Sequence, residues 1–451
     1  MTSKRWLLAL SAATLAGVVA RPRASLADDA LPPVRALLSD PSQLATWLRE
    51  HDPATLAARE KVTAQAELAE QSAVIPNPQA QLGVGGIVLG VNHQVDAMGN
   101  PIAGPTGLNQ TTNVAVGISE LIELGKRGPR RNAADLRTRE AGESAVCTLG
   151  SRLNGATTTL GNLAYLAAKH ALLAQNLADG RALQGYEQDR LKKGYLSGAD
   201  YERIELDTDE IELQLHRAET DVAVALSTCS ATLFAPCSAA GLDIAALDAA
   251  APIPAAVGDA AHAIAERPVH RAQQLEASAL GSDAQLADHR KIPDPTVGVQ
   301  YTYDNYTYGG SVPQTLTFSL GIPLPIFDRG NHDAAAARAN ARSIAASEQA
   351  LIRNERGQVE GLLVQLATLR AILDTLEKIE VPKSADVVDH AHKSFDLGET
   401  GPAELLLAEH QNRDLLLEVL DTRNDLFTVR SQLRLALGLD DEVARGIGAK
   451  R

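Results

Sequence analysis

Two segments of the chain carry apolar or small side chains at alternating intervals of four and three residues. One segment spans 204–225, and the other spans 408–429, displaced by 204 residues with the same intervals. A sustained period of about 3.5 residues predicts helices that pack along a coiled-coil seam. The predicted seam positions are Ile204, Thr208, Ile211, Leu215, Ala218, Val222 and Ala225, then Ala408, Asn412, Leu415, Val419, Thr422, Leu426 and Val429.

Several of these seam positions are small or polar, among them Thr208, Asn412 and Thr422. Such a seam packs less tightly than a leucine zipper and leaves one side of the helices facing water, as in the wall of a tube. A closed four-helix bundle would show the same period, so the pattern by itself leaves both arrangements open.

Very long helical stretches precede both seams, at about 128–193 and 331–397, without a cluster of loop residues that would divide them. The second stretch would extend for ~100 Å, several times the diameter of a small domain. Helices of this length must pack along one another. We expect a kink or break at Pro382 in the second stretch and at Asp179–Gly180 in the first.

Alternating positions predict one β-hairpin in each half of the chain. Thr315, Thr317 and Ser319 alternate with apolar residues, as expected for a strand with two different faces. Each hairpin follows a pair of prolines, at 75–78 and 292–295, and proline ends helices and favours extended chain. The expected strand segments are 79–89 and 112–122, then 296–306 and 314–324.

The order of helix, hairpin, long helix, turn and return helix occurs twice and predicts an internal two-fold repeat. We place the first repeat at 28–240 and the second at 266–440. A linker or equatorial segment at 241–265 joins them, and 441–451 forms a C-terminal tail.

The first 27 residues have the pattern of a secretory signal peptide. Lys4 and Arg5 precede an apolar stretch at 6–20, and small residues at 25 and 27 match a cleavage site. An uncleaved N-terminal anchor is the alternative. Export would place Cys229 and Cys237, eight residues apart, in an oxidising compartment where they could close a small disulfide. Cys147 lies in a predicted helix without an obvious partner.

Composition and charge exclude several classes of protein. Beyond the first 27 residues the chain has no run of about 18 apolar residues, so we expect no transmembrane helices. A formal net charge of -14 disfavours nucleic-acid binding. No phosphate loop, nucleophile elbow or Cys-x-x-Cys pair is present, and His390 and His392 point to different helix faces. We therefore expect no enzyme, no cofactor and no metal site.

Aromatic residues concentrate in the second hairpin region, where a membrane β-barrel would have its aromatic girdle. An ordinary sheet with an aromatic face is the alternative. Four strands cannot close around an aqueous lumen, and open edges are not tolerated in lipid, so closure would require further subunits. Three copies would supply twelve strands. The girdle candidates are Tyr301, Tyr303, Phe318 and Phe327, with Tyr306 and Tyr308 in the same region.

The junctions after the two hairpins carry a resemblance to a known family. Residues 123–130 read Glu-Leu-Gly-Lys-Arg-Gly-Pro-Arg, and residues 322–331 read Ile-Pro-Leu-Pro-Ile-Phe-Asp-Arg-Gly-Asn. With the two-fold order of elements, they resemble the TolC-type outer-membrane efflux-channel family, and in particular its heavy-metal, CzcC-like branch. Many members of that branch have a lipidated N-terminal cysteine, which is absent near the cleavage site here.

The resemblance implies a mainly α fold with a small β part. Three subunits would form a twelve-stranded barrel in the outer membrane and a helical tunnel in the periplasm. The homotrimer would be a passive conduit that contacts outer-membrane lipid and is served by a periplasmic adaptor protein and a proton-driven inner-membrane pump. Heavy-metal cations are the substrate class it suggests. The alternatives are small organic toxicants as substrates, or a soluble periplasmic coiled-coil scaffold without lipid-facing hairpins.

The same resemblance points to the turns between the long and return helices as the tunnel tip. Gly194, Ser197, Gly398 and Gly401 occupy these turns and would contact the adaptor, because small residues leave room for another helical hairpin. The alternative is that the glycines only cap the helices.

An acidic ring at the tunnel entrance is also implied. Glu404 is the first candidate, and Asp200 and Glu205 are second choices. Like charges held close together repel one another and attract cations. Favourable interaction of Asp200 and Glu404 with the helix dipole would explain both acids equally well. Leu407 occupies the place where some relatives carry another acid.

Overall fold

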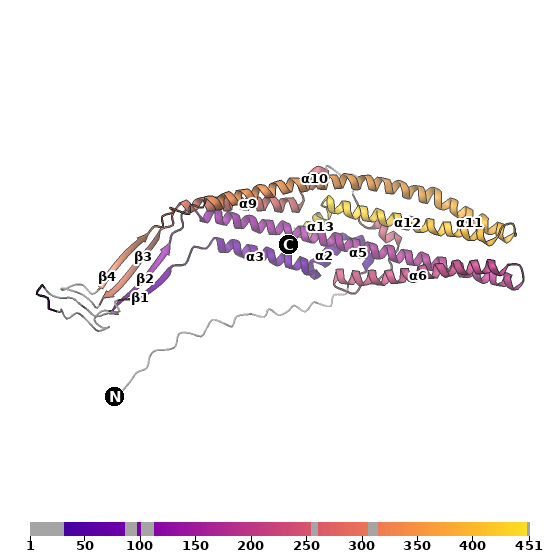
Figure 1. Ribbon diagram of the computed structural model, residues 1–451, viewed down its shortest axis with the longest axis horizontal. Coiled ribbons are helices and arrows are strands. Elements are labelled where there is room, and N and C mark those ends of the chain that lie inside the picture. The colour runs from indigo at the N-terminus through magenta and orange to yellow at the C-terminus, as the bar shows by residue number, and fades with distance from the viewer. Residues whose placement is uncertain (1–30, 86–96, 101–111, 254–259, 305–313, 449–451) are drawn as a thin grey trace, which may run out of the picture.

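The computed structural model describes residues 31–85, 97–100, 112–253, 260–304 and 314–448. The molecule is elongated, with a sheet at one end, long helices along the body and two helical turns at the other end (Figure 1). The expected signal peptide, residues 1–27, lies outside the described residues.

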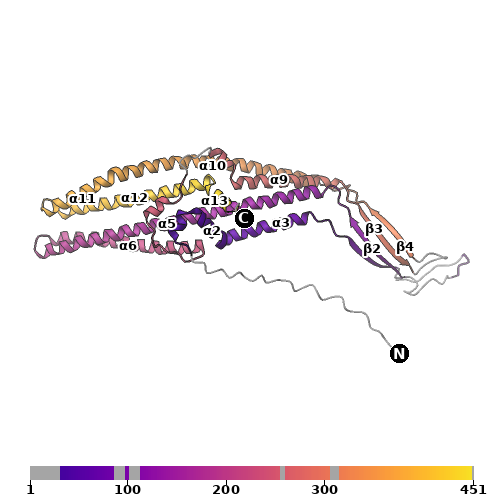
Figure 2. The ribbon, with the colours of Figure 1, turned by 180° about the vertical axis from the view of Figure 1, so that it is seen from behind.

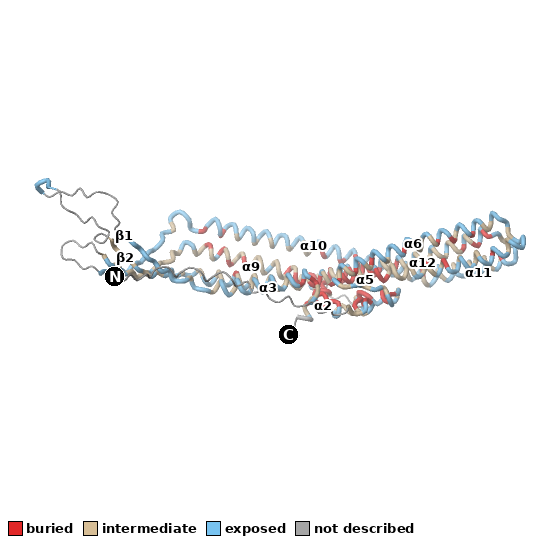
Figure 3. The backbone as a smooth tube through the Cα atoms, turned by 90° about the horizontal axis from the view of Figure 1, so that it is seen from below, coloured by how far each residue is buried: buried red, intermediate tan, exposed pale blue. Residues whose placement is uncertain are grey.

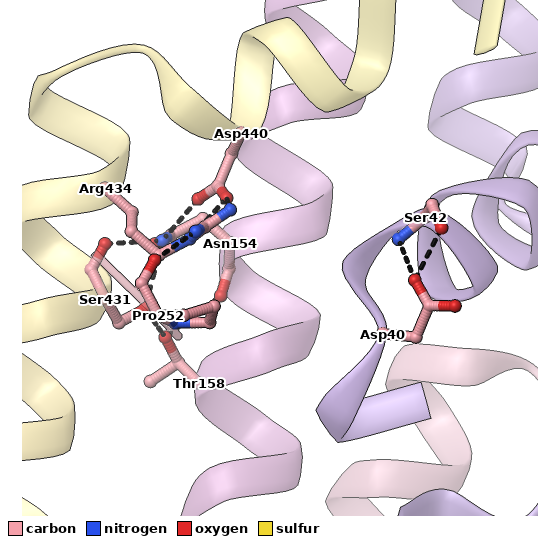
Figure 4. Close-up of polar contacts among 8 residues, drawn as sticks. All are labelled: Asp40, Ser42, Asn154, Thr158, Pro252, Ser431, Arg434 and Asp440. Carbon is pink, nitrogen blue, oxygen red and sulfur yellow. Dashed lines mark hydrogen bonds and ion pairs between the residues drawn. The ribbon is translucent and has the colours of Figure 1, made fainter. Parts of the chain in front are cut away.

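The first half of the chain begins with short capped helices. The Asp40 carboxylate accepts a hydrogen bond from the Ser42 backbone N–H at 3.0 Å, which caps α2 (Figure 4). Asp52 caps α3 in the same way through Thr55. The elements of this half are α1 Val34–Ser39, α2 Pro41–His51, α3 Pro53–Ser72, β1 Gln79–Gly85, β2 Asn113–Leu121, α5 Arg127–Lys192 and α6 Gly198–Leu233.

The second half has the same general order, with hairpin strands followed by long helices. Two short helices, α7 and α8, lie within 241–265, and α13 includes most of the segment expected to be a tail. The elements are α7 Ile244–Ala249, α8 Ala260–Ala265, α9 Pro268–Asp288, the 3₁₀ turn η1 His289–Lys291, β3 Thr296–Asp304, β4 Gln314–Gly321, α10 Asn331–Thr375, the π-helical turn η2 Leu376–Glu380, α11 Val381–Asp396, α12 Pro402–Ala436 and α13 Leu439–Gly448.

The predicted break at Pro382 is confirmed. The π-helical turn η2 separates α10 from α11 and ends two residues before this proline, which has no N–H to donate to the preceding turn. A kink or break was also predicted at Asp179–Gly180, and a break there is wrong, because α5 continues from Arg127 to Lys192. Glycine lowers helix propensity but keeps its N–H donor, and Gly180 lies beside the side chains of Thr208 and Ile211 from α6.

The long helices pack along one another, and the predicted seams lie inside these contacts. Helix α5 packs against α3, α6 and α9, while α10 packs against α9 and α12 (Figure 2). All fourteen predicted seam positions are buried or half-buried, with Ile204 and Ile211 at 1% and 2% exposure. The 3.5-residue period therefore identified the packed faces correctly. None of the described helices is long and apolar enough to cross a membrane.

The buried core is concentrated in the middle of the body rather than at its ends (Figure 3). It brings together α1, α2, α5, α6 and α7 with one large side chain from the second half, Phe427 of α12. A Cβ at Gly161 would lie 2.1 Å from the Phe427 ring, so the close approach of α5 and α12 requires glycine there.

Two covalent or polar links hold this central region together. The predicted disulfide between Cys229 and Cys237 is present and ties the last turn of α6 to the loop that follows, while Cys147 is free. Asn154 of α5 donates hydrogen bonds to Ser431 and to Asp440, and Arg434 donates to Asp440 at 2.8 and 3.0 Å (Figure 4). This network joins α5, α12 and α13.

The four strands form one antiparallel sheet in the order β1-β2-β3-β4. The two hairpins are joined by pairing of β2 with β3, for example Val116 opposite Tyr301. A strand is present in each of the four expected segments, although β4 ends at Gly321 rather than 324, and residues 86–89 and 305–306 lie outside the described residues. The sheet includes strands from both halves of the chain. Its edge strands are β1 and β4.

Candidate functional sites at the sheet and the helical tip

The register of the sheet places apolar side chains on one face. Most of these side chains are exposed, and Leu82 and Phe318 have 76% and 78% of their surface accessible. Three girdle candidates, Tyr301, Tyr303 and Phe318, lie on this face, and Phe327 is 99% exposed in the segment that follows β4. Tyr306 and Tyr308 lie outside the described residues. The apolar face consists of Ala80, Leu82, Val84, Val114, Val116, Ile118, Val297, Val299, Tyr301, Tyr303, Leu316, Phe318 and Leu320, with Glu120 and Gln314 as its polar members.

The opposite face of the sheet is polar or small, apart from Leu121 at the end of β2. It carries Gln79, Gln81, Ser119, Gln300, Thr302, Thr315, Thr317 and Ser319, interspersed with glycine and alanine. A sheet with one apolar and one polar face separates an apolar medium from water.

The two tip turns have the same backbone geometry. Gly194 and Gly398 adopt left-handed conformations, with φ of 79° and 74°. In each turn the residue after the glycine donates its N–H to a carbonyl five residues earlier, Tyr195 to Arg190 and Glu399 to Ser394. These are left-handed helix C-caps, so both glycines have a structural role in reversing the chain. A capping role leaves their exposed surface free for a partner.

The two return helices begin differently. Ser197 caps α6, because its Oγ accepts from the Asp200 N–H at 3.1 Å and donates to the Asp200 carboxylate at 2.7 Å. Gly401 caps α12 without a side-chain hydrogen bond, and Pro402 follows it. The acid of the first turn is therefore tied to its cap, whereas the acid of the second turn is not.

The three predicted entrance acids lie on two different helical hairpins, one formed by α5 and α6 and the other by α11 and α12. Glu205 is exposed on α6, and Asp200 is half-buried beside Ser197. Glu404 is exposed and lines an open groove of about 340 Å³ between α11 and α12. The groove is also lined by His390, Ser394, Thr400, Leu407 and Gln411.

Polar contacts between the two hairpins were missed by the sequence analysis. Arg413 of α12 donates to the Asp207 carboxylate of α6 at 2.6 Å, and the Arg190 guanidinium lies 4.8 Å from the centre of the Phe395 ring. The available signal was the pairing of opposite charges next to equivalent seam positions, since Asp207 precedes Thr208 and Arg413 follows Asn412. These contacts hold the two helical hairpins of one chain side by side.

Histidines near the tip are engaged within the protein. His390 Nδ1 donates to the Asp386 carbonyl at 2.6 Å, and His392 Nε2 lies 2.9 Å from a Glu409 carboxylate oxygen. Burial raises the pKa of Glu409, against the lowering effect of His392 and Arg413. In the part of the chain that the structure describes, no three His, Cys, Asp or Glu side chains are grouped closely enough to hold a metal ion.

Comparison with solved structures identifies the architecture. The structure of CusC, studied for folding and transmembrane channel formation, matches with a TM-score of 0.73 at 14% identity over 91% of this chain and 95% of that one. The outer-membrane channel OprN matches with a TM-score of 0.71 at 15% identity over 91% and 93%. The outer membrane protein VceC from Vibrio cholerae matches with a TM-score of 0.68 at 15% identity over 88% and 96%. The chain has the fold of these outer-membrane channels.

Sequence comparison adds a family match in the second half of the chain. Residues 261–439 match the model of the family described as outer membrane efflux protein. This range includes β3, β4 and the helices from α9 to α12. A search of curated proteins found no match. The expected mainly α fold with a small β part is confirmed, together with its likeness to outer-membrane channels.

Proposed function

We propose that the protein is the outer-membrane channel subunit of a tripartite efflux system. The observation that carries the proposal is the channel fold over nine-tenths of the chain, with a TM-score of 0.73 to CusC. The efflux-family match of residues 261–439 and the apolar and polar faces of the sheet support it.

The barrel of this channel requires three copies of the chain. One chain supplies four strands with open edges at β1 and β4, and three copies supply twelve. The apolar face then contacts outer-membrane lipid and the polar face lines the lumen. Tyr301, Tyr303, Phe318 and Phe327 provide the aromatic girdle. Exposed apolar side chains on the helices, such as Leu68 and Val364 at 56% and 67%, fit burial between subunits.

The helices of the trimer form a periplasmic tunnel whose tip meets the adaptor protein. Gly194, Ser197, Gly398 and Gly401 lie at the surface of the two tip turns and provide the contact for an adaptor hairpin. A proton-driven inner-membrane pump supplies the energy. Heavy-metal cations are the proposed substrates, supported by the CzcC-like residues at 123–130 and 322–331.

Membrane fractionation and mass in detergent test the proposed channel. We expect the full chain, expressed with its N-terminal segment, to be extracted only from outer membranes and to have the mass of a trimer by light scattering. A soluble monomer or dimer would contradict it and support the periplasmic scaffold. Resistance assays with metal salts and with organic toxicants, using the same adaptor and pump, separate the two substrate classes.

Glu404→Gln tests the proposed entrance ring of Glu404, with Asp200 and Glu205 as its weaker candidates. Three carboxylates near the threefold axis favour cations, so the variant trimer should lose cation preference in planar bilayers, measured as a reversal potential closer to zero. Glu360→Gln, an exposed acid in the body of α10, is the matched control. An unchanged reversal potential for Glu404→Gln would remove the ring from the mechanism.

A further inference from the structure

Basic residues are concentrated at the junction between the sheet and the helices. The segments 122–131, 289–295 and 322–331 contain seven Lys and Arg residues and three carboxylates, in a chain whose net charge is -14. The junction is therefore locally positive on an acidic protein. We call this set of segments the basic junction.

Three helix ends meet in the basic junction. His289 Nδ1, at the end of α9, lies 2.7 Å from the Gly125 carbonyl before α5. Gly330, before α10, packs against the Ala287 carbonyl of α9 so closely that a Cβ there would lie 2.0 Å from it. The ends of α5, α9 and α10 that carry these segments therefore lie together at one end of the helical body, next to the sheet (Figure 1).

Some of these cations are neutralised within the chain. Lys126 pairs with Asp294 at 2.6 Å, and Arg130 binds Glu123 through two hydrogen bonds. Arg290 pairs with Asp333 and lies 3.9 Å from Asp328. These pairs fix the connection between strands and helices.

The other four cations of the basic junction have no carboxylate partner among the described residues. All four side chains are exposed. Arg329 Nε donates only to the Pro325 carbonyl, at 3.3 Å, which leaves the rest of its guanidinium free. The four are Arg127, Arg131, Lys291 and Arg329.

Exposed apolar side chains continue from the sheet into the same region. Leu324, Ile326 and Phe327 are 72%, 61% and 99% exposed, and Ile322 is 52% exposed. In the chain they lead from β4 to Arg329, and Asp328, which follows them, lies 3.9 Å from Arg290 of η1, so an apolar segment is followed directly by positive charge. This order matches the order of acyl chain and phosphate in a phospholipid leaflet.

We propose that the basic junction binds the headgroup phosphates of anionic phospholipids in the leaflet nearest the helical body. Arg127, Arg131, Lys291 and Arg329 supply the positive charge, and the apolar residues 322–327 supply the contact with the acyl region. The inference rests on the proposed function, since it requires the sheet to lie in a membrane. Occupation by an acidic segment of another protein is the alternative that the experiment must exclude.

Native mass spectrometry of the detergent-extracted full chain, titrated with phosphatidylglycerol or phosphatidylcholine, tests the proposal. Each exposed cation near an anionic headgroup strengthens binding about fivefold, so we expect a preference for phosphatidylglycerol of ~10-fold or more. The fourfold variant Arg127→Gln, Arg131→Gln, Lys291→Gln and Arg329→Gln should lose this preference at unchanged oligomer mass.

Two further variants make the result specific. Arg217→Gln, Arg353→Gln, Arg356→Gln and Lys193→Gln together remove equally many exposed charges away from the junction and should leave the preference intact. Replacing the three arginines without a carboxylate partner, Arg127, Arg131 and Arg329, by lysine keeps the charge and should also preserve the preference for phosphatidylglycerol.

The outcomes distinguish this inference from the proposed function. Equal binding of both lipids by the wild-type trimer, or an unchanged preference in the junction variant, overturns the lipid site and leaves the channel standing. A chain that is not extracted from membranes overturns both. If the junction variant loses binding of the adaptor or another protein but keeps its lipid preference, the basic junction is assigned to a protein partner instead.

Discussion

Two consecutive aspartates at the start of α13 are both buried but have different surroundings. Asp440 accepts hydrogen bonds from Arg434 and Asn154. Asp441 is 3% exposed, has no hydrogen bond to either carboxylate oxygen, and faces Arg267 at 3.6 Å. Burial raises the pKa of Asp441 to about 6, despite the lowering effect of Arg267. Asp440 is therefore held in an ion pair with Arg434, whereas Asp441 titrates in mildly acidic solution.

We predict that Asp441 makes the folded protein less stable as pH rises from about 4 to about 6. Its folded pKa is above the unfolded value of 3.8, so its contribution is fully present below that value and is lost as pH passes through about 6. The loss is about 3 kcal/mol at most. Urea unfolding at a series of pH values should show it as the difference between the wild type and Asp441→Asn.

Neighbouring groups define the control for this experiment. Glu355 and His270, which lie 2.8 Å apart, and Arg445 remain in both proteins, so the difference between them isolates Asp441. Asp440→Asn removes the partner of Arg434 and should destabilise the protein at every pH. Parallel pH profiles for the wild type and Asp441→Asn would contradict the prediction.

At the scale of elements, helix periodicity and caps explain most of the long helices, while their interruptions need more information. Gly180 leaves α5 continuous, and the break in the second long helix takes the form of a π-helical turn. Arg423 of α12 donates to Glu377 within that turn at 2.5 and 3.0 Å, so a neighbouring helix holds the irregular geometry. The two helical hairpins at the tip are likewise joined, through the ion pair of Asp207 with Arg413.

The disulfide between Cys229 and Cys237 should stabilise the end of α6. Closing a loop of eight residues removes conformational entropy from the unfolded chain, so Cys229→Ala with Cys237→Ala should lose about 2–3 kcal/mol. Urea unfolding with and without a reductant measures this loss. Cys147→Ala, which leaves the disulfide intact, should keep the response to reductant, and a reductant without effect on the wild type would contradict the prediction.

At the scale of the whole molecule, the sheet has a large exposed apolar face that one chain does not cover. Its members come from both halves, because β2 pairs with β3. The proposed trimer gives this face to lipid and the polar face to the lumen, which explains why two faces of one sheet differ so strongly in polarity. Membrane insertion should therefore depend on which face receives a charge.

Adjacent substitutions in β4 test the assignment of the faces. Leu316→Lys places a charge on the apolar face and should cost about 2–4 kcal/mol near the middle of the membrane, which reduces the yield of extracted trimer. Thr317→Lys places the same charge on the polar face and should be tolerated. Equal yields for both variants would contradict a lipid-facing role for Leu316.

Local patterns in the sequence were sufficient to predict the helix seams, the four strands, the helix ends marked by the prolines before the strands, and the turns at Gly194 and Gly398. Each depends on residues only a few positions apart, where side-chain period, proline and glycine act directly on the backbone. The roles of Glu404 and of the tip residues toward partners stay predictions.

Only the tertiary structure decided which distant segments meet. Pairing of β2 with β3, the contact of Asp207 with Arg413, the burial of Asp441 and the gathering of free cations at the basic junction all join residues far apart in the chain. Burial, ion pairing and pKa values depend on distances in space, which are set by how the long helices pack rather than by any local pattern.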